Sequence, residues 1–194
     1  MKSKSLLWGL AILLSLGIIA CQQGPKPEVV TQVAELTTQD PIQRGKYLVE
    51  AIGCADCHSP KKMTEQGPVL DMDRYMMGYD ASMPLPPVPQ EVPLGPWILM
   101  TGDLTAAVGP WGVSYAANLT PHASGLGNWS IEQFKKALRE GKYKGLDNSR
   151  PLMPPMPVQA FRNLTDQDLE AMFAYLQSLR PIDNVVPAYQ PPGS

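Results

Sequence analysis

Two thiols and an imidazole lie within five residues of one another in the stretch Cys54-Ala55-Asp56-Cys57-His58. Two cysteines three residues apart, with a histidine directly after the second, form the attachment signature of c-type haem. One helical turn sets the two sulfurs about as far apart as the two vinyl groups of a porphyrin, so each thiol can add across a vinyl group to form a thioether. His58 then lies beneath the iron as its proximal ligand. The pentapeptide therefore predicts one covalently bound haem c.

The same Cys-x-x-Cys spacing occurs in thiol-redox proteins, in which the motif lowers the pKa of a cysteine. Such proteins carry the motif in a βαβ context, which this sequence lacks, and that function would leave the histidine without a role. We therefore favour haem attachment over thiol redox chemistry. Alkylation of Cys54 and Cys57 in the native protein would support the alternative, because thioether sulfurs do not react.

A haem iron that only transfers electrons keeps both axial positions filled, so a second ligand is expected besides His58. The sequence has one further histidine, His122, and ten methionines. Two of the methionines stand in a proline-rich frame, Pro151-Leu152-Met153-Pro154-Pro155-Met156-Pro157. Prolines fix the backbone, so a thioether in this frame can point at the iron with little entropy left to lose. The residues alone leave Met153 and Met156 both open as ligands.

Helical patterns on both sides of the motif would hold these groups in place. Each pattern begins with a residue type that caps helices, namely Asp40, Ser130 and Thr165, and each continues with apolar residues at helical spacing. A glycine ends each of the first two patterns, and Pro181 ends the third. The three predicted helices cover residues 41–52, 131–140 and 166–180.

Residues 59–117 show no long periodic pattern. The stretch from Pro84 to Pro96 contains six prolines, a composition that excludes helix and favours polyproline II structure. The runs Ile98–Thr101 and Val113–Asn118 are predicted to pair as a short β-hairpin. A methionine-rich patch can bind Cu(I), but we favour packing beside the haem, and we expect the whole segment to wrap the haem edge. The methionines concerned are Met63, Met72, Met76, Met77, Met83 and Met100.

The first twenty residues are typical of an export signal. Lys2 and Lys4 give a positive start, and the apolar run Leu6–Ala20 is shorter than the roughly 20 residues that a membrane span needs. Residues 18–21, Ile-Ile-Ala-Cys, resemble a bacterial lipobox, which predicts that Cys21 receives lipid and becomes the new N-terminus. Ordinary cleavage before that cysteine is the alternative, and it would leave an unpaired thiol on an exported protein.

Charge and length restrict the partners further. The chain has 16 basic and 18 acidic residues, and loss of the signal peptide removes two lysines, which leaves a net charge of −4 before any haem propionates. An acidic domain without a basic run is a poor nucleic-acid binder, so no nucleic-acid partner is expected. The predicted organisation is a signal peptide at 1–20, a lipidated N-terminus and tether at 21–40, one domain at 41–187 and a C-terminal tail at 188–194.

Several stretches taken together resemble a class I cytochrome c domain. They are the Cys54–His58 motif, Asn118–Pro121, Gly125–Trp129 and the run from Met156 to Leu176. The sequence is similar, over roughly residues 41–187, to the cytochrome subunits of bacterial membrane-bound dehydrogenases and to single-haem cytochrome c lipoproteins. The resemblance implies a mostly α cytochrome c fold, here with a long Pro/Met-rich wrapping segment and a short β-hairpin.

The resemblance also implies roles for individual residues. In this family the ligand methionine lies nine residues before the threonine of a Leu-Thr-Asp cap, which implies Met156 as the distal ligand and leaves Met153 as the runner-up. His122 is expected on the surface. The candidate contacts to the haem propionates are Trp129, Tyr115 and Arg150.

Gly45 lies on the apolar face of the first predicted helix, where a glycine costs about 1 kcal/mol relative to alanine. Another segment is therefore expected to pack against the bare backbone at this position. The resemblance implies that the first and last helices cross closely, so the predicted partner is an aromatic residue such as Tyr175 or Phe173.

We therefore predict an electron-transfer protein, not itself an enzyme, that carries one haem c and is anchored by lipid to a bacterial membrane, facing the periplasm or the cell exterior. Several acyl chains anchor a protein stably without spanning the bilayer. Its expected partners are redox proteins, and a membrane respiratory or dehydrogenase complex is a candidate among them. Two alternatives stay open: a fixed cytochrome subunit of such a complex, and a haem sensor or enzyme with an open sixth site that would bind CO when reduced.

Overall fold

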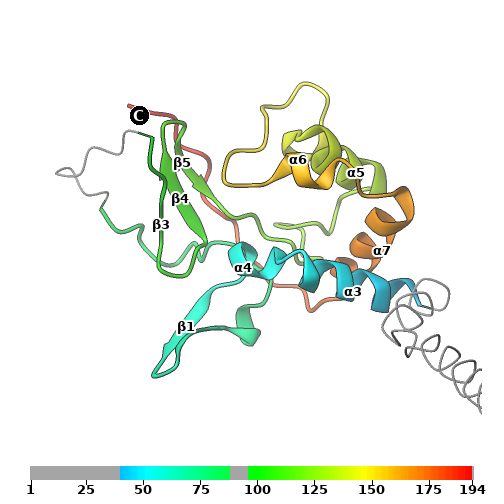
Figure 1. Ribbon diagram of the computed structural model, residues 1–194, viewed down its shortest axis with the longest axis horizontal. Coiled ribbons are helices and arrows are strands. Elements are labelled where there is room, and N and C mark those ends of the chain that lie inside the picture. The colour runs from blue at the N-terminus through cyan, green and yellow to red at the C-terminus, as the bar shows by residue number, and fades with distance from the viewer. Residues whose placement is uncertain (1–39, 88–95, 194) are drawn as a thin grey trace, which may run out of the picture. The chain divides into compact units, whose positions relative to one another are not determined.

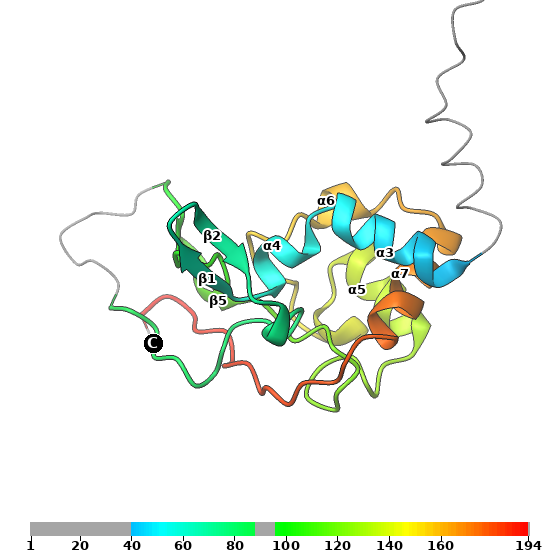
Figure 2. The same cartoon turned by 90° about the horizontal axis from the view of Figure 1, so that it is seen from below.

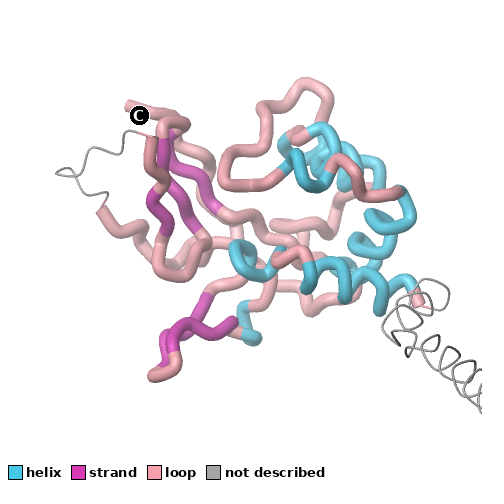
Figure 3. The backbone as a smooth tube through the Cα atoms, in the orientation of Figure 1, coloured by secondary structure: helices cyan, strands magenta, loops and turns pink. Residues whose placement is uncertain are grey.

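The computed structural model describes residues 40–87 and 96–193. The predicted signal peptide, the predicted lipid site at Cys21 and the tether up to residue 39 lie outside the described residues. Within the described part the helices gather at one end and the two small sheets at the other, with the short helix α4 between them (Figures 1 and 2). Long loops join these elements (Figure 3). No helix among the described residues is long and apolar enough to cross a bilayer.

The first described helix, α3, spans Pro41–Ala51. The Asp40 carboxylate caps it by accepting a hydrogen bond from the backbone N–H of Ile42 at 2.9 Å, and Pro41 occupies the first helical position. The capping role of Asp40 matches the sequence prediction. The buried residues of this helix, Gly45, Leu48 and Val49, lie on one face, which packs against α7.

Helix α7 spans Asp166–Gln177 and crosses α3 at Gly45. A Cβ atom at Gly45 would lie 1.9 Å from the carbonyl oxygen of Ala171 and 2.9 Å from Cβ of Tyr175. The predicted close crossing is therefore confirmed, with Tyr175 as one of the two contacts. Phe173 packs elsewhere, since its ring lies 5.2 Å from the ring of Phe134 on α5.

Helices α5, Ile131–Glu140, and α6, Val158–Phe161, complete the helical end. The prediction that Ser130 caps α5 is confirmed. The Gln133 N–H donates to Oγ of Ser130 at 3.2 Å, and the Ser130 N–H donates to the Gln133 side chain at 2.9 Å, which completes a capping box. Gly141 ends the helix in the left-handed conformation. Buried residues from all these helices meet in one core: Leu48, Val49, Ala55, Phe134, Leu138, Phe161, Leu169, Met172, Tyr175 and Leu176, together with Met76 and Leu126.

The other end of the described part contains two antiparallel sheets. Strand β1, Lys61–Thr64, pairs with β2, Gly67–Leu70, and the second sheet has the order β3-β4-β5. The predicted pairing of Ile98–Thr101 with Val113–Asn118 is wrong, because β4 lies between β3 and β5 and pairs with both. A tight turn from Gly109 to Gly112 joins β4 directly to β5, so β4 and not β3 lies beside β5. The three strands are Leu99–Met100, Ala106–Gly109 and Gly112–Tyr115.

The prediction of a mostly α fold is only partly confirmed, because the region between α4 and α5 forms these sheets and a single turn of 3₁₀ helix, η1, at Met72–Arg74. Most of the Pro-rich stretch, residues 88–95, lies outside the described residues. Of the six methionines expected to fill gaps, Met76 and Met77 are buried. Met63, Met72, Met83 and Met100 are exposed, and their packing beside the haem stays a prediction.

Candidate haem-binding site

Helix α4 spans Cys54–His58 and carries both thiols and the imidazole of the motif. Gly53 precedes it with a φ of 79°, in the left-handed region that side chains disfavour, and lets the chain turn from α3 into α4. The turn closes with two backbone hydrogen bonds, from the Asp56 N–H to the Gly53 carbonyl at 3.0 Å and from the Ser59 N–H to the Ala55 carbonyl at 3.2 Å. A single helical turn therefore presents all three groups, as the spacing predicts.

The buried His58 ring is fixed by the backbone of a distant segment. Its Nδ1 lies 2.8 Å from the carbonyl oxygen of Ala117. A carbonyl oxygen can only accept, so Nδ1 carries the proton and the lone pair of Nε2 is left free, which is the arrangement that metal-bound histidines adopt. Burial lowers the pKa of His58, which keeps the imidazole neutral and able to ligate.

Residues 76–79 join the motif to the segment that carries Ala117. The Gly78 N–H donates to the His58 carbonyl at 2.9 Å, and the Tyr79 N–H donates to the Ala116 carbonyl at 2.9 Å. Met76 is fully buried; its N–H donates to Oγ of Ser59 at 2.9 Å. Sequence reasoning missed this connection, because backbone hydrogen bonds of loop residues leave no pattern in the side chains.

The segment after Ala117 is held by Asn118, which is buried. Its side-chain oxygen accepts from the backbone N–H of Thr120 at 2.9 Å and from the Thr120 hydroxyl at 2.7 Å. Its amide nitrogen donates to the Ile182 carbonyl at 2.9 Å. The stretch Asn118–Pro121 was therefore a usable signal: its buried turn holds the carbonyl that orients His58.

The two thiols are half-buried and form no disulfide with each other. Burial raises the pKa of the Cys54 thiol to about 11, and burial is also the main cause that raises the pKa of Cys57. Thiol-redox pairs need the opposite shift, because the thiolate is the reactive species. The environment of the motif therefore argues against the thiol-redox alternative.

The proline-rich frame forms a loop that returns the chain to α6. The Leu152 N–H donates to the Gly141 carbonyl at 2.7 Å, and the Val158 N–H donates to the Met156 carbonyl at 2.9 Å. Met153 and Met156 are both half-buried. Met156 packs against the core that contains Ala55 of the motif helix, whereas Met153 is not among the side chains that do so.

The side chains around His58 suit a haem better than a bare metal ion. No cluster of three or more His, Cys, Asp or Glu side chains that could hold a bare metal ion occurs among residues 40–87 and 96–193. A single buried imidazole with a free Nε2, beside two thiols on one helical turn, instead suits an iron whose other ligands come mainly from a porphyrin. The residues present therefore fit haem c.

Comparison with known proteins agrees with this donor set. The sequence profile of the cytochrome c family matches residues 42–180. The chain belongs to the cytochrome c family. It is 31% identical over 153 residues to the fructose dehydrogenase cytochrome subunit of Gluconobacter japonicus, which covers 78% of this chain and 24% of that protein. It is 37% identical over 143 residues to the cytochrome c subunit of the quinone alcohol dehydrogenase of Gluconobacter oxydans (strain 621H), which covers 73% of this chain and 22% of that protein.

A third relative is the gluconate 2-dehydrogenase cytochrome c subunit of Pantoea cypripedii, 29% identical over 69% of this chain and 22% of that protein. The cytochrome chain thus spans about a quarter or less of the length of these curated relatives. They are named as cytochrome subunits of dehydrogenases, which confirms the resemblance found in the sequence and agrees with the prediction of an electron-transfer component. Membership of the family also implies covalent haem c.

The three candidate propionate contacts occupy different places in the cytochrome domain. Trp129 is half-buried and packs against the core, and Tyr115 ends β5 with its ring 4.9 Å from that of Tyr79 in an edge-on contact. The Arg150 guanidinium lies 3.9 Å from the ring centre of Tyr143 and 5.2 Å from that of Tyr189. Their contacts with propionates stay a prediction. His122 is half-exposed, as expected.

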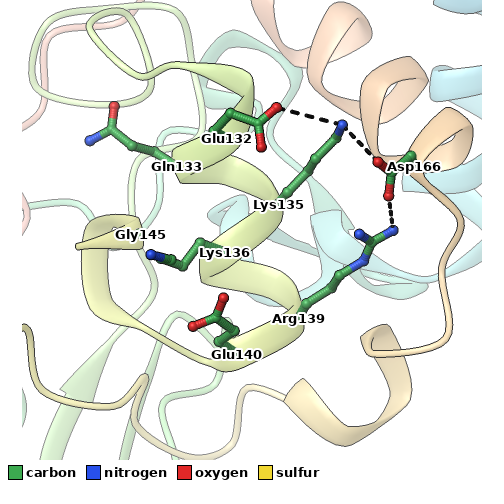
Figure 4. Close-up of a pocket in the computed structure, with 8 residues that line it drawn as sticks. All are labelled: Glu132, Gln133, Lys135, Lys136, Arg139, Glu140, Gly145 and Asp166. Atoms are coloured by element: carbon green, nitrogen blue, oxygen red, sulfur yellow. Dashed lines mark hydrogen bonds and ion pairs between the residues drawn. The ribbon is translucent and has the colours of Figure 1, made fainter. Parts of the chain in front are cut away.

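A separate cavity of about 330 Å³ lies over the outer face of α5 (Figure 4). Lys135 approaches Glu132 at 3.7 Å and Asp166 at 3.1 Å, and Arg139 forms an ion pair with the same Asp166. Each of these charges has an opposite partner, so we assign this surface a structural role in joining α5 to α7.

Proposed function

We propose that this cytochrome c domain carries one covalent haem c and transfers single electrons between redox proteins outside the cytoplasmic membrane. The observation that carries the proposal is the buried His58 imidazole, whose Nδ1 proton is held by the Ala117 carbonyl at 2.8 Å so that Nε2 is free for iron. When bound, the haem supplies an iron that changes its oxidation state by one electron. The chain's own residues hold and orient that iron.

Each residue has a distinct role in this proposal. The sulfurs of Cys54 and Cys57 would form thioethers with the haem, His58 would be the proximal ligand, and the Met156 thioether would be the distal ligand. A neutral, soft methionine favours Fe(II) and so raises the reduction potential. With His58 and Met156 both ligating, the iron would accept and release an electron without exchanging a ligand.

Covalent attachment can be tested directly. The full chain, produced with a c-type haem maturation system, should keep its haem through acid-acetone extraction and stain for haem on a denaturing gel. Replacement of both Cys54 and Cys57 by alanine should abolish the stain, because no thioether can form. Haem that is extracted from the unaltered protein would refute the proposal, and the ratio of haem to protein tests whether one haem is bound.

The choice of distal ligand is tested by a pair of matched variants in the same loop. Met156→Ala should erase the weak far-red sulfur-to-iron band of the oxidised protein, lower the reduction potential and let CO bind the reduced protein. Met153→Ala should keep the band. The opposite pattern would show that Met153 ligates the iron, and an unchanged band in both variants would show that another residue does.

A fixed place in a dehydrogenase complex is the second candidate function, and the names of the relatives favour it. The relatives that the chain resembles are cytochrome subunits of fructose, gluconate and alcohol dehydrogenases. Purification from native membranes under mild detergent distinguishes the two cases. A stoichiometric dehydrogenase partner would identify a subunit, whereas a haem protein that is purified alone and is reduced by several donors would identify a shuttle.

We also propose that Cys21 anchors the mature protein to the membrane by lipid. The support is the sequence Ile18-Ile19-Ala20-Cys21 behind an export signal. Labelled palmitate should enter the unaltered protein and not the Cys21→Ala variant, which should still bind haem. Equal labelling of the two proteins would contradict the anchor.

A further inference from the structure

The loop that carries Met156 has an unusual hydrogen-bonding capacity. Residues 151–157 include four prolines, at 151, 154, 155 and 157, and proline has no backbone N–H. Other segments can therefore hold this loop mainly through its carbonyl oxygens. The Pro154 carbonyl, two residues before Met156, accepts a hydrogen bond of 2.6 Å from the hydroxyl of Ser114.

Ser114 is a buried residue of β5, 7% exposed, and its own orientation is fixed. The indole N–H of Trp111 donates to Oγ of Ser114 at 3.2 Å. Because a hydroxyl has a single proton, the Ser114 proton is directed to one acceptor, and the Pro154 carbonyl at 2.6 Å is closer than the Ala107 carbonyl at 3.4 Å. The chain of donors runs from the Trp111 indole through the Ser114 hydroxyl to the loop.

The strand that carries Ser114 is itself braced on its outer edge. Val113 and Gln190 exchange two backbone hydrogen bonds, of 2.8 and 3.0 Å. The Tyr189 hydroxyl donates to the Trp111 carbonyl at 2.5 Å, and the Tyr189 ring also contacts the guanidinium of Arg150 at the start of the loop. The sheet and residues 189–190 therefore form one support for the loop.

We propose that Ser114 is a positioning residue for the Met156 ligand. Its hydroxyl holds the Pro154 carbonyl, which restricts the loop to the position from which the thioether reaches the iron. The inference rests on the proposed function in one respect, that Met156 is the distal ligand. It assigns a role to the sheet that sequence reasoning had connected only with wrapping the haem edge.

The test measures how readily the loop releases the iron. In the full-length oxidised protein with haem attached, imidazole replaces methionine at a rate limited by opening of the loop. Loss of one hydrogen bond should make this replacement about fivefold faster in Ser114→Ala. Ser114→Thr, which keeps the hydroxyl on a strand residue, should restore the rate to near that of the unaltered protein. Ser149→Ala is the matched control, because the Ser149 hydroxyl bonds the Leu146 carbonyl within its own turn at 2.8 Å.

A second readout separates positioning from general stability. On heating, Ser114→Ala should lose the far-red sulfur-to-iron band well before it loses its helical circular dichroism, whereas a purely structural role would shift both transitions together. Wild-type kinetics in Ser114→Ala, an equal effect in Ser149→Ala, or a joint shift of both transitions would overturn the inference and leave the proposed function intact. A far-red band that survives Met156→Ala would instead overturn the ligand assignment, and the inference with it.

Discussion

At Gly45 the backbone of α3 meets the backbone of α7 with no side chain between them. The Ala171 carbonyl occupies the place where a Cβ atom would stand, 1.9 Å away. This carbonyl belongs to the backbone of a helix, which cannot move aside as a flexible side chain can. The residue type at position 45 therefore fixes how closely the two helices approach.

Gly45→Ala should destabilise the haem-loaded protein although alanine is the better helix former. Overpacking at a rigid contact costs about 1–3 kcal/mol, which exceeds the gain in helix propensity of about 1 kcal/mol. Denaturant unfolding followed by circular dichroism measures the difference. Gly102→Ala is the control, because a Cβ at Gly102 has no heavy atom within 4 Å and its φ is not in the left-handed region. If both variants unfolded at the same denaturant concentration, the close crossing would be refuted.

At the scale of elements, an ion pair fixes the same crossing. The Arg44 guanidinium of α3 donates to the Asp168 carboxylate of α7 at 2.9 Å, and both side chains are about four-fifths buried. Burial alone would raise the pKa of Asp168, but the hydrogen bonds from Arg44 and Thr165 outweigh it and hold the pKa below the ordinary value of 3.8. Asp168 is therefore a carboxylate whose charged form stabilises the fold.

Asp168→Asn should lower the free energy of unfolding by about 1 kcal/mol at pH 7. The pKa of Asp168 is lower in the folded protein than in the unfolded chain. The stabilisation by the charged carboxylate is therefore complete above pH 3.8 and is lost as the pH falls through the lower, folded pKa. The difference between the two proteins should then shrink in acid. Unfolding curves between pH 7 and pH 3 measure it, with Glu65→Gln as the control because Glu65 is an exposed acid in the turn between β1 and β2. A difference independent of pH would contradict this account of the ion pair.

The helices and the sheets were not equally predictable from the sequence. Helices α3, α5 and α7 each follow a capping residue, and their apolar residues recur every three or four positions. The pattern that predicts each helix therefore lies within about a dozen consecutive residues. Strands β3 to β5 have two to four residues each. Such lengths are too short for a period of two to be recognised, and Ala106–Gly109 has few of the β-branched residues that favour strands. Their order depends on pairing that no local pattern encodes.

The residues of the candidate site also differ in whether the sequence alone could reveal them. Cys54, Cys57 and His58 were found because their chemistry requires those residue types at that spacing. The Ala117 carbonyl that orients His58 could not be found, since every residue has a carbonyl and only the fold decides which one lies 2.8 Å from the ring. Ser114 was missed for a related reason: a serine in a strand has no distinguishing pattern until the loop that it holds is in place.

At the scale of the whole described domain, residues 181–190 connect the helical end with the sheets (Figure 1). Asn184 is buried, and its amide nitrogen donates to the carbonyls of Met77 and Tyr79 at 2.7 and 2.8 Å. Its side-chain oxygen accepts from the Ala81 N–H at 3.2 Å. One side chain therefore satisfies three backbone groups of the segment that joins His58 to its carbonyl partner.

Asn184→Ala should destabilise the haem-loaded protein by about 2–3 kcal/mol, because it leaves buried carbonyls without donors. It should also loosen the segment that holds His58. Chemical denaturation monitored at the haem absorption band would detect this as a transition at lower denaturant concentration. Asn163→Ala is the matched control, since Asn163 is exposed in the loop before α7. Equal stability of the two variants would show that residues 77–81 do not depend on Asn184.

The hydrogen-bond partners that hold His58 and the Tyr79 carbonyl lie far apart along the chain. The carbonyl that fixes His58 lies 59 residues after it, and the side chain that holds the Tyr79 carbonyl lies 105 residues after that tyrosine. A chain that emerges from its N-terminal end therefore presents Cys54–His58 as an open peptide long before the groups that bury the imidazole have been made. A chain that is cut short before residue 184 keeps the attachment sequence but lacks the side chain that holds the Tyr79 carbonyl.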